Sequence, residues 1–487
     1  MSATFSPQTD RHHLISRIQG CWLGKSIGGT LGLPAEGRME RLSFSFYDPV
    51  PTIAPPNDDL ELQLVWLDLV ENKLETTSSL TQADFARAWL DHIHYMWDEY
   101  GRTRWNLRRG VPVENVGTFE NPFHAGMGSP IRSEIWACLF PGDPDSAAHY
   151  AALDASLDHG TEGIAGEVFF AAMQSECAAG VELKTAIVRG LNFVPEETEM
   201  VCAVNFVRHA HREGLPEWDC WHALLARHGH ENFTHAPLNV ALTIWALLYG
   251  AGDFEKSILL ATNAGYDTDC TAATVGATLG LILGDKAIPH RWIEPIGDGV
   301  YVGPGIQGIR VPATLGELTS RTAALIGRLE KKTWDPAFWN ERLPHVELAS
   351  LPGTIDLQPE GGGAVVPWAN GELPESVKTA GGATWVWQGS DEVREIICLA
   401  RKGAKLFLDG QLLAECPADL PYVPATHRCP PRSRVRIQPA PGCHEMRLVL
   451  NEPDPQQEAS VILAYPNFHI CPWTTAELPF PARLPVT

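Results

Sequence analysis

The spacing of apolar residues changes near residue 345, and this change constrains the possible fold more than any other feature. Before it, apolar residues recur at helical spacing, for example over residues 60–70, 165–172 and 242–249. After it, short runs such as TWVWQG and ASVILAYP have the pattern of strands. We therefore predict a mainly α protein: an all-helical domain over residues 1–340, followed by a small C-terminal β-sandwich over residues 345–487.

Turn signals divide the strand-like half. Asp409-Gly410 lies between two apolar stretches and predicts a tight hairpin, and Pro441-Gly442 predicts a second one within SRVRIQPAPGCHEMRLVL. The segment LPGTIDLQPEGGGAVVP is either a linker or a first edge strand. Trp385 and Trp387 have the pattern of exposed residues that stack on sugars, although aromatic residues of a β-module are equally often core.

Length, charge and cysteine content narrow the class of protein. A chain of 487 residues favours two domains. Its formal net charge of -22 argues against nucleic acid and anionic membrane as partners, since both require a basic face. The 11 cysteines include no C-x-x-C pair, which is typical of reduced thiols. Without an apolar signal core or a bilayer-spanning run, the protein is predicted to be cytoplasmic, and its oligomeric state stays open.

Small residues mark two helices that must pack very closely. Glycines at four-residue spacing form one stripe of the first predicted helix, at Gly20, Gly24, Gly28 and Gly32. The segment CTAATVGATLG, residues 270–280, has little side chain with which to bury area. Such helices gain stability only where another backbone comes close, so a helix–helix seam is predicted. Glu36 follows where the first helix should end, and it is either an ordinary loop acid or part of a site.

Acidic side chains cluster at two predicted helix starts. Asn57, Asp58 and Asp59 follow a Pro-Pro pair, and Asp267 and Asp269 precede the small-residue helix. Capping explains either group alone, because Asn and Asp are favoured caps and acids complement the helix dipole. One cap, however, needs one side-chain oxygen, and carboxylates one residue apart can point at the same spot, as a hard cation requires. The two groups together favour a magnesium site.

These motifs occur in an order that resembles the ADP-ribosylglycohydrolase family. The resemblance rests on a glycine-rich first helix ending in L-G-x-P-x-E, an N/T-D-D helix start, and G-x-D-T-D before a small-residue helix. The segment AGMGSPIRSEIW is also similar to the family's glycine-rich substrate loop. The resemblance covers about residues 14 to 330. Members of the family include the dinitrogenase reductase-activating glycohydrolase and a lens crystallin. The β-sandwich is not covered and resembles an accessory module.

The resemblance implies an all-α fold with two Mg²⁺ ions at its centre. The implied metal ligands are Asn57, Asp58, Asp59, Asp267, Asp269 and Cys270, and the family's mobile glutamate corresponds to Glu36. Asn57 and Cys270 stand where the family usually has Thr, and Gly29 stands where it commonly has Asp. A thiol is a poor ligand for magnesium. Thr271, one residue further along, is an alternative ligand in place of Cys270, so whether the second site binds a metal ion stays open.

The implied reaction is hydrolysis of an N- or O-glycosidic bond at the anomeric carbon of ADP-ribose or a related riboside. Cleavage passes through an oxocarbenium-like state, and the predicted catalytic residues are Asp58, Asp59 and Glu36, with Asp58 or Asp59 as the base. The substrate-binding candidates, each with a structural role as its alternative, are Gly128, Ser129, Arg132, His159, His235 and Asn239. The partner is an ADP-ribosylated or small-molecule substrate. A smaller glycoside or nucleoside, or a non-catalytic crystallin-like role, is the alternative.

Overall fold

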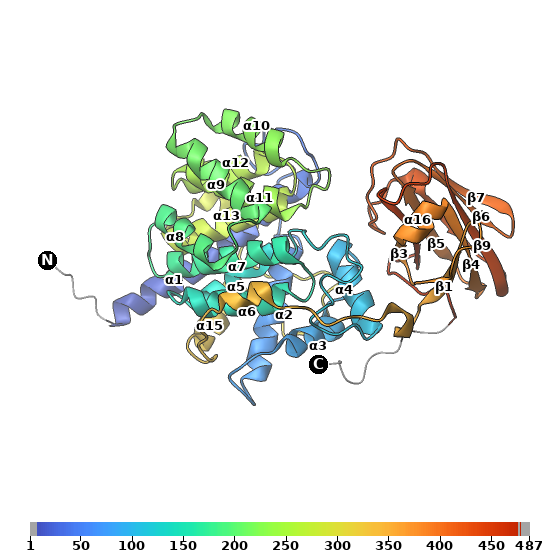
Figure 1. Ribbon diagram of the computed structural model, residues 1–487. Coiled ribbons are helices and arrows are strands. Elements are labelled where there is room, and N and C mark those ends of the chain that lie inside the picture. The colour runs from blue at the N-terminus through green and yellow to red at the C-terminus, as the bar shows by residue number, and fades with distance from the viewer. Residues whose placement is uncertain (1–6, 476–477, 479–487) are drawn as a thin grey trace. The chain divides into compact units, whose positions relative to one another are not determined.

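The computed structural model describes residues 7–475 and 478, and it confirms a helical domain followed by antiparallel sheets (Figure 1). Two compact units are present. The helical unit contains the described residues up to 94 together with residues 124–342, and the β unit contains residues 95–123 together with the described residues from 343 onward. The division into domains at 1–340 and 345–487 stays a prediction. Because residues 95–123 pack in the β unit, the prediction can be tested by asking whether residues 1–340 fold alone.

The helical unit is built from helices joined by short loops. Its helices are α1 (Pro7–Gly32), α2 (Asp58–Lys73), α3 (Gln82–His92), α5 (Ser133–Leu139), α6 (Pro144–Ala155), α7 (Thr161–Ala178), α8 (Leu183–Gly190), α9 (Glu199–Arg212), α10 (Glu217–His228), α11 (Ala236–Gly250), α12 (Phe254–Asn263), α13 (Thr268–Leu283), α14 (His290–Ile293) and α15 (Leu315–Leu325). The three segments with helical spacing lie in α2, α7 and α11. Within the part of the chain that the structure describes, no helix is both long and apolar enough to cross a membrane.

The predicted seam joins α1 to α13, which lie side by side through the helical unit (Figure 1). A Cβ atom built on Gly24 would lie 2.0 Å from the carbonyl oxygen of Gly276, and one built on Gly280 would lie 1.9 Å from that of Gly20. Neither position therefore has room for a side chain. The pairing is antiparallel, so the end of α1 meets the start of α13, where the Thr268 hydroxyl donates to the Gly32 carbonyl at 2.8 Å.

The β unit contains two antiparallel sheets that form the predicted sandwich. The larger sheet has the strand order β2-β1-β4-β9-β6-β7 and the smaller has the order β3-β10-β5-β8. The strands are β1 (Ile355–Pro359), β2 (Val366–Trp368), β3 (Gly371–Glu372), β4 (Gly382–Gly389), β5 (Arg394–Ala400), β6 (Ala404–Leu408), β7 (Gln411–Cys416), β8 (Arg434–Ile437), β9 (Gly442–Leu450) and β10 (Ala459–Ala464), and the unit also contains helices α4 (Asp98–Arg108) and α16 (Glu375–Ala380).

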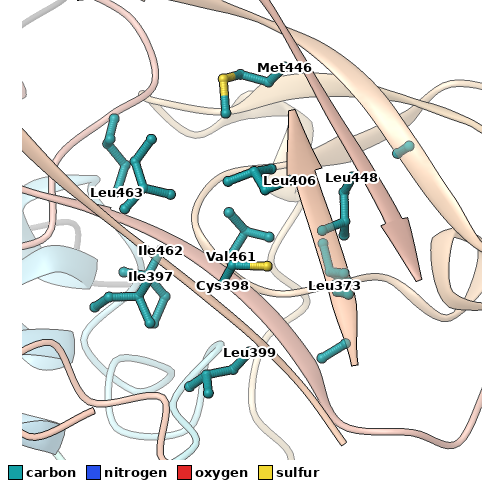
Figure 2. Packing of buried hydrophobic residues seen from close by; sticks show 14 of the residues in the cluster. Leu373, Ile397, Cys398, Leu399, Leu406, Met446, Leu448, Val461, Ile462 and Leu463 are labelled. Atoms are coloured by element: carbon teal, nitrogen blue, oxygen red, sulfur yellow. The ribbon is translucent and has the colours of Figure 1, made fainter. Parts of the chain in front are cut away.

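Apolar side chains from both sheets meet in one core (Figure 2). Strands β5 and β10 contribute from the smaller sheet and β6 and β9 from the larger, with Ile397, Leu399, Leu406, Met446, Leu448, Val461 and Leu463 among the buried residues. Trp385 and Trp387 also belong to this core: they are 4% and 2% exposed and pack edge-on against Trp473. The interpretation of these two residues as exposed sugar-stacking residues is therefore wrong.

One of the two predicted hairpins is present. Strands β6 and β7 pair around Asp409-Gly410, whose φ angles of 48° and 78° suit a tight turn. The hairpin predicted at Pro441-Gly442 is wrong, because β8 pairs with β5 in the smaller sheet while β9 pairs with β4 and β6 in the larger. The chain crosses between the sheets there. Of the two interpretations of LPGTIDLQPEGGGAVVP, the strand is confirmed: this segment contains β1 and most of the edge strand β2.

Helix α4 is tied to the β unit by buried cationic and aromatic side chains. The Arg102 guanidinium donates to the carbonyl of Asn370 at 3.0 Å, and that of Arg109 donates to the carbonyl of Pro352 at 3.1 Å. Trp105 packs in a small apolar cluster with Ala369 and Leu478. These contacts explain why residues 95–123 separate from the helical unit.

Candidate active site

The antiparallel seam places Glu36 beside the start of α13. Two backbone hydrogen bonds tie the loops that follow α1 and precede α13: Gly37 N–H donates to Tyr266 C=O at 2.9 Å, and Tyr266 N–H donates to Arg38 C=O at 2.8 Å. Tyr266 has a φ of 68°, a left-handed conformation that costs a non-glycine residue roughly 1–2 kcal/mol. The two bonds hold this conformation and set the direction in which Asp267 leaves the turn.

The second acidic helix start reaches the same place through Asn57. Its side-chain oxygen accepts from the Asp59 N–H at 2.7 Å, so the capping interpretation holds for this residue. Its amide group donates to Asp269 at 3.1 Å and thereby links the starts of α2 and α13. Asp267 occupies the N-cap position of α13, yet within the described residues its side chain makes no capping hydrogen bond. Capping therefore does not account for the Asp267 carboxylate.

Two sets of possible metal ligands result, and they share Asp269. The oxygen set consists of Glu36, Asp267 and Asp269, and the sulfur set consists of Asp59, Asp269 and Cys270. Within each set, one ligand atom per residue lies within 4.8 Å of the others. All members are buried except the exposed Glu36. Residues predicted from three separate motifs thus converge.

The carboxylates of this cluster repel one another. Burial raises the pKa of Asp269 well above its usual range, and the charges of Glu36 and Asp59 raise it further. Burial and the charge of Asp269 likewise raise the pKa of Asp267. Burial and the neighbouring Asp59 raise the pKa of Asp58, which belongs to neither set. A bound cation would offset this repulsion and favour the ionised carboxylates.

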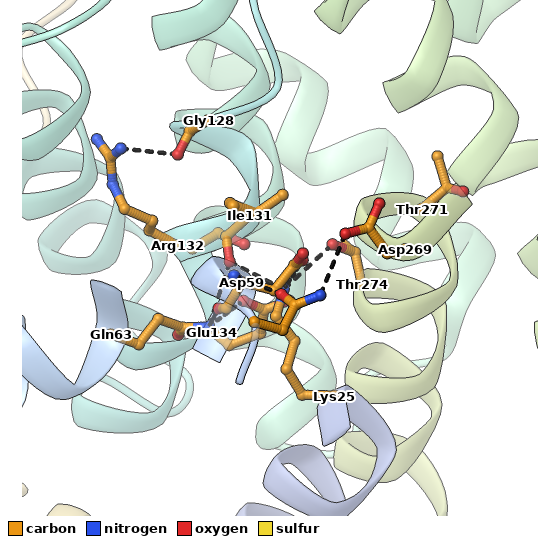
Figure 3. A network of polar contacts seen from close by, with 12 residues as sticks. Lys25, Asp59, Gln63, Gly128, Ile131, Arg132, Glu134, Asp269, Thr271 and Thr274 are labelled. Carbon is orange, nitrogen blue, oxygen red and sulfur yellow. Dashed lines mark hydrogen bonds and ion pairs between the residues drawn. The ribbon is translucent and has the colours of Figure 1, made fainter. Parts of the chain in front are cut away.

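One buried lysine already neutralises part of the cluster (Figure 3). The Lys25 ammonium lies 3.1 Å from Asp59 Oδ1 and 3.1 Å from Glu134 Oε1. Burial would lower the pKa of Lys25, but Glu134 and Asp59 together raise it above its usual range, so the ammonium stays charged. Gln63 donates to the other Glu134 oxygen at 2.9 Å. The sequence did not predict the roles of Lys25 and Glu134. The signal for each was a single charged residue, Lys25 within the glycine-rich first helix and Glu134 within the apolar segment SEIWACL.

The residues present fit a small cation. Among the described residues, Asp59 Oδ2 and Asp269 Oδ1 are buried and accept no hydrogen bond from a nitrogen or hydroxyl donor. Leaving a buried carboxylate oxygen unpaired is costly, and a metal ion satisfies it. A cavity of about 20 Å³, which is room for roughly one water-sized species, lies beside Gly29, Asn57 and Asp59, but of the two ligand sets only Asp59 lines it.

The glycine-rich loop residues lie in a separate buried network. The Arg132 guanidinium is clamped between Asp154 and Asp158, with its shortest contact at 2.7 Å, and it also donates to the Gly128 carbonyl (Figure 3). The Ser129 hydroxyl donates to the Gly163 carbonyl at 3.1 Å, and His159 Nδ1 lies 2.8 Å from Asp158 Oδ1. These contacts suit the structural alternative. Substrate contact by Gly128, Ser129, Arg132 and His159 stays a prediction.

Asn239 connects the remaining candidates to the cluster. Its side-chain oxygen accepts from the Asp267 N–H at 3.3 Å, and its amide group donates to the carbonyl of His235 at 2.9 Å. Asn239 therefore helps to position Asp267. The His235 ring stacks on that of His230, with ring centroids 4.0 Å apart. Substrate contact by Asn239 or His235 also stays a prediction.

Most of the helical part of the chain is similar to one known protein family. The family model for ADP-ribosylglycohydrolase matches residues 10–332, which is more than half of the chain. The chain belongs to the ADP-ribosylglycohydrolase family. A protein from Archaeoglobus fulgidus, whose description names no activity, is 25% identical over 301 residues, or 59% of this chain and 93% of that protein. A solved structure described as an ADP-ribosylglycohydrolase-related protein complex is 21% identical, with a TM-score of 0.42, and the match covers 64% of this chain and 98% of that one. The ADP-ribosylglycohydrolase match includes every ligand candidate and ends before β1.

Proposed function

We propose that this chain is a magnesium-dependent glycohydrolase that cleaves an N- or O-glycosidic bond at the anomeric carbon of ADP-ribose or a related riboside. One observation carries the proposal: the two acidic helix starts converge with Glu36, although the motifs lie far apart in the sequence. Among the described residues, Asp59 and Asp269 there each keep a buried oxygen that accepts no hydrogen bond from a nitrogen or hydroxyl donor. Membership of the ADP-ribosylglycohydrolase family supports the reaction class.

In this proposal the metal ligands are the three residues of the oxygen set together with Asp59 and Cys270 from the sulfur set. A bound metal would act as a template that orients the ribose hydroxyls and as a Lewis acid toward the oxygen atoms that it contacts. The other contributions come from the chain. Asp59 is held by Lys25 at 3.1 Å, so Asp58 is the better base for the proton of the attacking water. The carboxylates around it stabilise the positive charge that develops at the anomeric carbon. Glu36 lies exposed at the rim of the cluster, where it can contact a ribose hydroxyl.

The alternatives have less support. The burial of Trp385 and Trp387 removes the feature that favoured a sugar-binding module. A non-catalytic crystallin-like role would be supported by loss of the acidic residues, yet Asp58, Asp59 and Asp267 are present beside Asp269 and Glu36. A smaller glycoside or nucleoside is distinguished by assaying hydrolysis of an ADP-ribosylated peptide beside that of an unphosphorylated riboside.

Calorimetric titration of Mg²⁺ into the Asp269→Asn variant tests the metal assignment. The change keeps the shape of the side chain but removes one charge, and we expect the affinity for Mg²⁺ to fall at least about tenfold, because losing a direct ligand costs no less than disturbing an outer one. Asp285→Asn, at the other end of α13, is the matched control and should keep the wild-type affinity. Unchanged affinity in Asp269→Asn would contradict the proposal, as would absence of hydrolysis in the metal-loaded wild-type protein.

A further inference from the structure

The two ligand sets differ in the chemistry of their donor atoms. The oxygen set offers three carboxylates, whereas the sulfur set offers the carboxylates of Asp59 and Asp269 and the thiol of Cys270. Mg²⁺ is a hard cation that binds oxygen, whereas sulfur donors favour softer ions such as Zn²⁺ or Co²⁺. The two sets are therefore not equivalent, even though they share Asp269.

An independent observation indicates that the sulfur set binds a ligand. Asp59 is 1% exposed and Asp269 is 4% exposed, and among the described residues each has an oxygen atom without a nitrogen or hydroxyl donor. The Cys270 thiol, which belongs to the same set, is a side-chain donor beside Asp59. Lys25 is 3.1 Å from Asp59 Oδ1, so this ion pair engages one of the two Asp59 oxygens. Asp59 and Asp269 both belong to the sulfur set. In this set one carboxylate oxygen of Asp59, one of Asp269 and the Cys270 sulfur all lie within 4.8 Å of one another.

The neighbouring hydroxyl groups are already used inside the helix packing. The Thr268 hydroxyl donates to the Gly32 carbonyl at 2.8 Å, and the Thr271 hydroxyl donates to the Thr268 carbonyl at 3.3 Å. Thr271, considered from the sequence as a displaced ligand in place of Cys270, is thus turned back onto its own helix. On the first turn of α13, Cys270 is the side chain that completes the set with Asp59 and Asp269.

We propose that the sulfur set selects a thiophilic divalent ion, of the Zn²⁺ or Co²⁺ class, while Mg²⁺ binds at the oxygen set. This inference rests on the proposed function, since it assigns different metals to the two halves of the same site. On binding, the sulfur–metal bond forms, the Cys270 S–H bond breaks, and its proton passes to solvent. Cys270 is then the residue that determines the metal specificity of the second position.

The test uses Co²⁺, because sulfur coordination to Co²⁺ gives a near-ultraviolet charge-transfer absorption that oxygen ligands lack. The full-length protein is stripped with a chelator, supplied with excess Mg²⁺, and titrated with Co²⁺. We expect the absorption in the wild-type protein and its loss in Cys270→Ser, which keeps the size of the side chain. Cys202→Ser removes an exposed thiol on α9 and should keep the absorption.

Two further measurements make every result decisive. Circular dichroism establishes that Cys270→Ser is folded, and if it is not, Asp59→Asn serves instead, with Co²⁺ affinity expected to fall at least about tenfold. Wild-type protein without the absorption, or a folded Cys270→Ser protein or an Asp59→Asn protein that binds Co²⁺ as the wild type does, overturns the inference. Hydrolysis with Mg²⁺ alone and no absorption overturns this inference but not the proposed function. The absorption without hydrolysis overturns the proposed function and supports the Co²⁺ assignment.

Discussion

Two buried basic residues near the candidate site lie in opposite electrostatic environments. Lys25 contacts two carboxylates and remains charged. His235 is buried beside other histidines, and its nearest acidic neighbour, Glu199, is 3.9 Å away. Burial lowers the pKa of His235 to about 3, and the charges of His230, His124 and His228 act in the same direction. The first residue supplies a positive charge to the cluster, whereas the second stays neutral.

The neutral state of His235 predicts a loss of stability in acid. Its pKa is about 3 in the folded protein and about 6.5 in an unfolded chain, so the unfolded state binds the extra proton first. Stability is therefore complete above about pH 6.5 and falls as the pH decreases toward 3. Between about pH 7.5 and about pH 5, we expect wild-type protein to lose about 2 kcal/mol more unfolding free energy than His235→Gln.

Denaturant unfolding at the two pH values measures this difference. His290→Gln replaces an exposed histidine on α14 and should keep the wild-type dependence on pH. If His235→Gln loses as much stability in acid as the wild type does, burial of this histidine is not what limits stability there.

The acidic residues of the site could be predicted from the sequence, but their counter-charge could not. Asn57 and Asp267 each lie at a helix start that a local pattern reveals. The ion pair of Lys25 with Glu134 joins residues 109 positions apart, on α1 and α5, so it depends on the tertiary fold and not on a local pattern. Arg132 was similarly visible in its loop, whereas its burial between Asp154 and Asp158 depends on α6.

At the scale of elements, the α1–α13 seam fixes where the two loops of the site meet. The four-residue spacing of glycines predicted the first helix, and the run of small residues predicted the second helix and the close contact between the two. In the β unit, alternation along TWVWQG predicted the strand but could not show which face is inside: Val386 is exposed and its two tryptophan neighbours are buried. The Pro441-Gly442 turn signal likewise could not reveal that its flanking strands belong to different sheets.

The seam predicts a sharp difference between two glycine substitutions in α1. In Gly24→Ala the new methyl group would lie 2.0 Å from a backbone oxygen of α13, which cannot move aside locally. We expect a loss of about 1–3 kcal/mol or more in unfolding free energy, together with weaker Mg²⁺ binding as Glu36 shifts relative to Asp267. Thermal unfolding and calorimetric titration measure the two effects.

Gly29→Ala is the matched control within the same helix. Its nearest neighbour would be the Asn57 side chain at 3.4 Å, an ordinary contact. Because Ala is the better helix former, this variant should be unchanged or more stable by up to about 1 kcal/mol. Equal destabilisation of both variants would show that the seam is less tight than the backbone distances indicate.

At the scale of the whole molecule, residues 95–123 interrupt the helical unit in sequence and pack in the β unit. The change in apolar spacing near residue 345 predicted the succession of two architectures. It could not predict this excursion, because α4 has the local pattern of any helix. Its partners, including the carbonyls of Asn370 and Pro352, come from residues more than 240 positions away.

A fragment of residues 1–340 tests how far the helical unit depends on the rest. The ligand candidates and the seam lie within it, so we expect it to fold with helical circular dichroism. Arg102, Trp105 and Arg109 lose their partners in the fragment, so limited proteolysis should cut first within residues 95–123. The full chain, digested in parallel, should resist cleavage there. An insoluble or molten fragment would show that the β unit is required for folding.

The antiparallel seam also sets the order in which the chain can acquire its site during synthesis. The two residues joined at the mouth of the seam, Gly32 and Thr268, are 236 positions apart. At roughly 5–20 residues per second, the ribosome needs roughly ten to fifty seconds to produce the second after the first. Throughout that time the glycine stripe of α1 has no partner, and the site can assemble only after most of the helical unit has emerged.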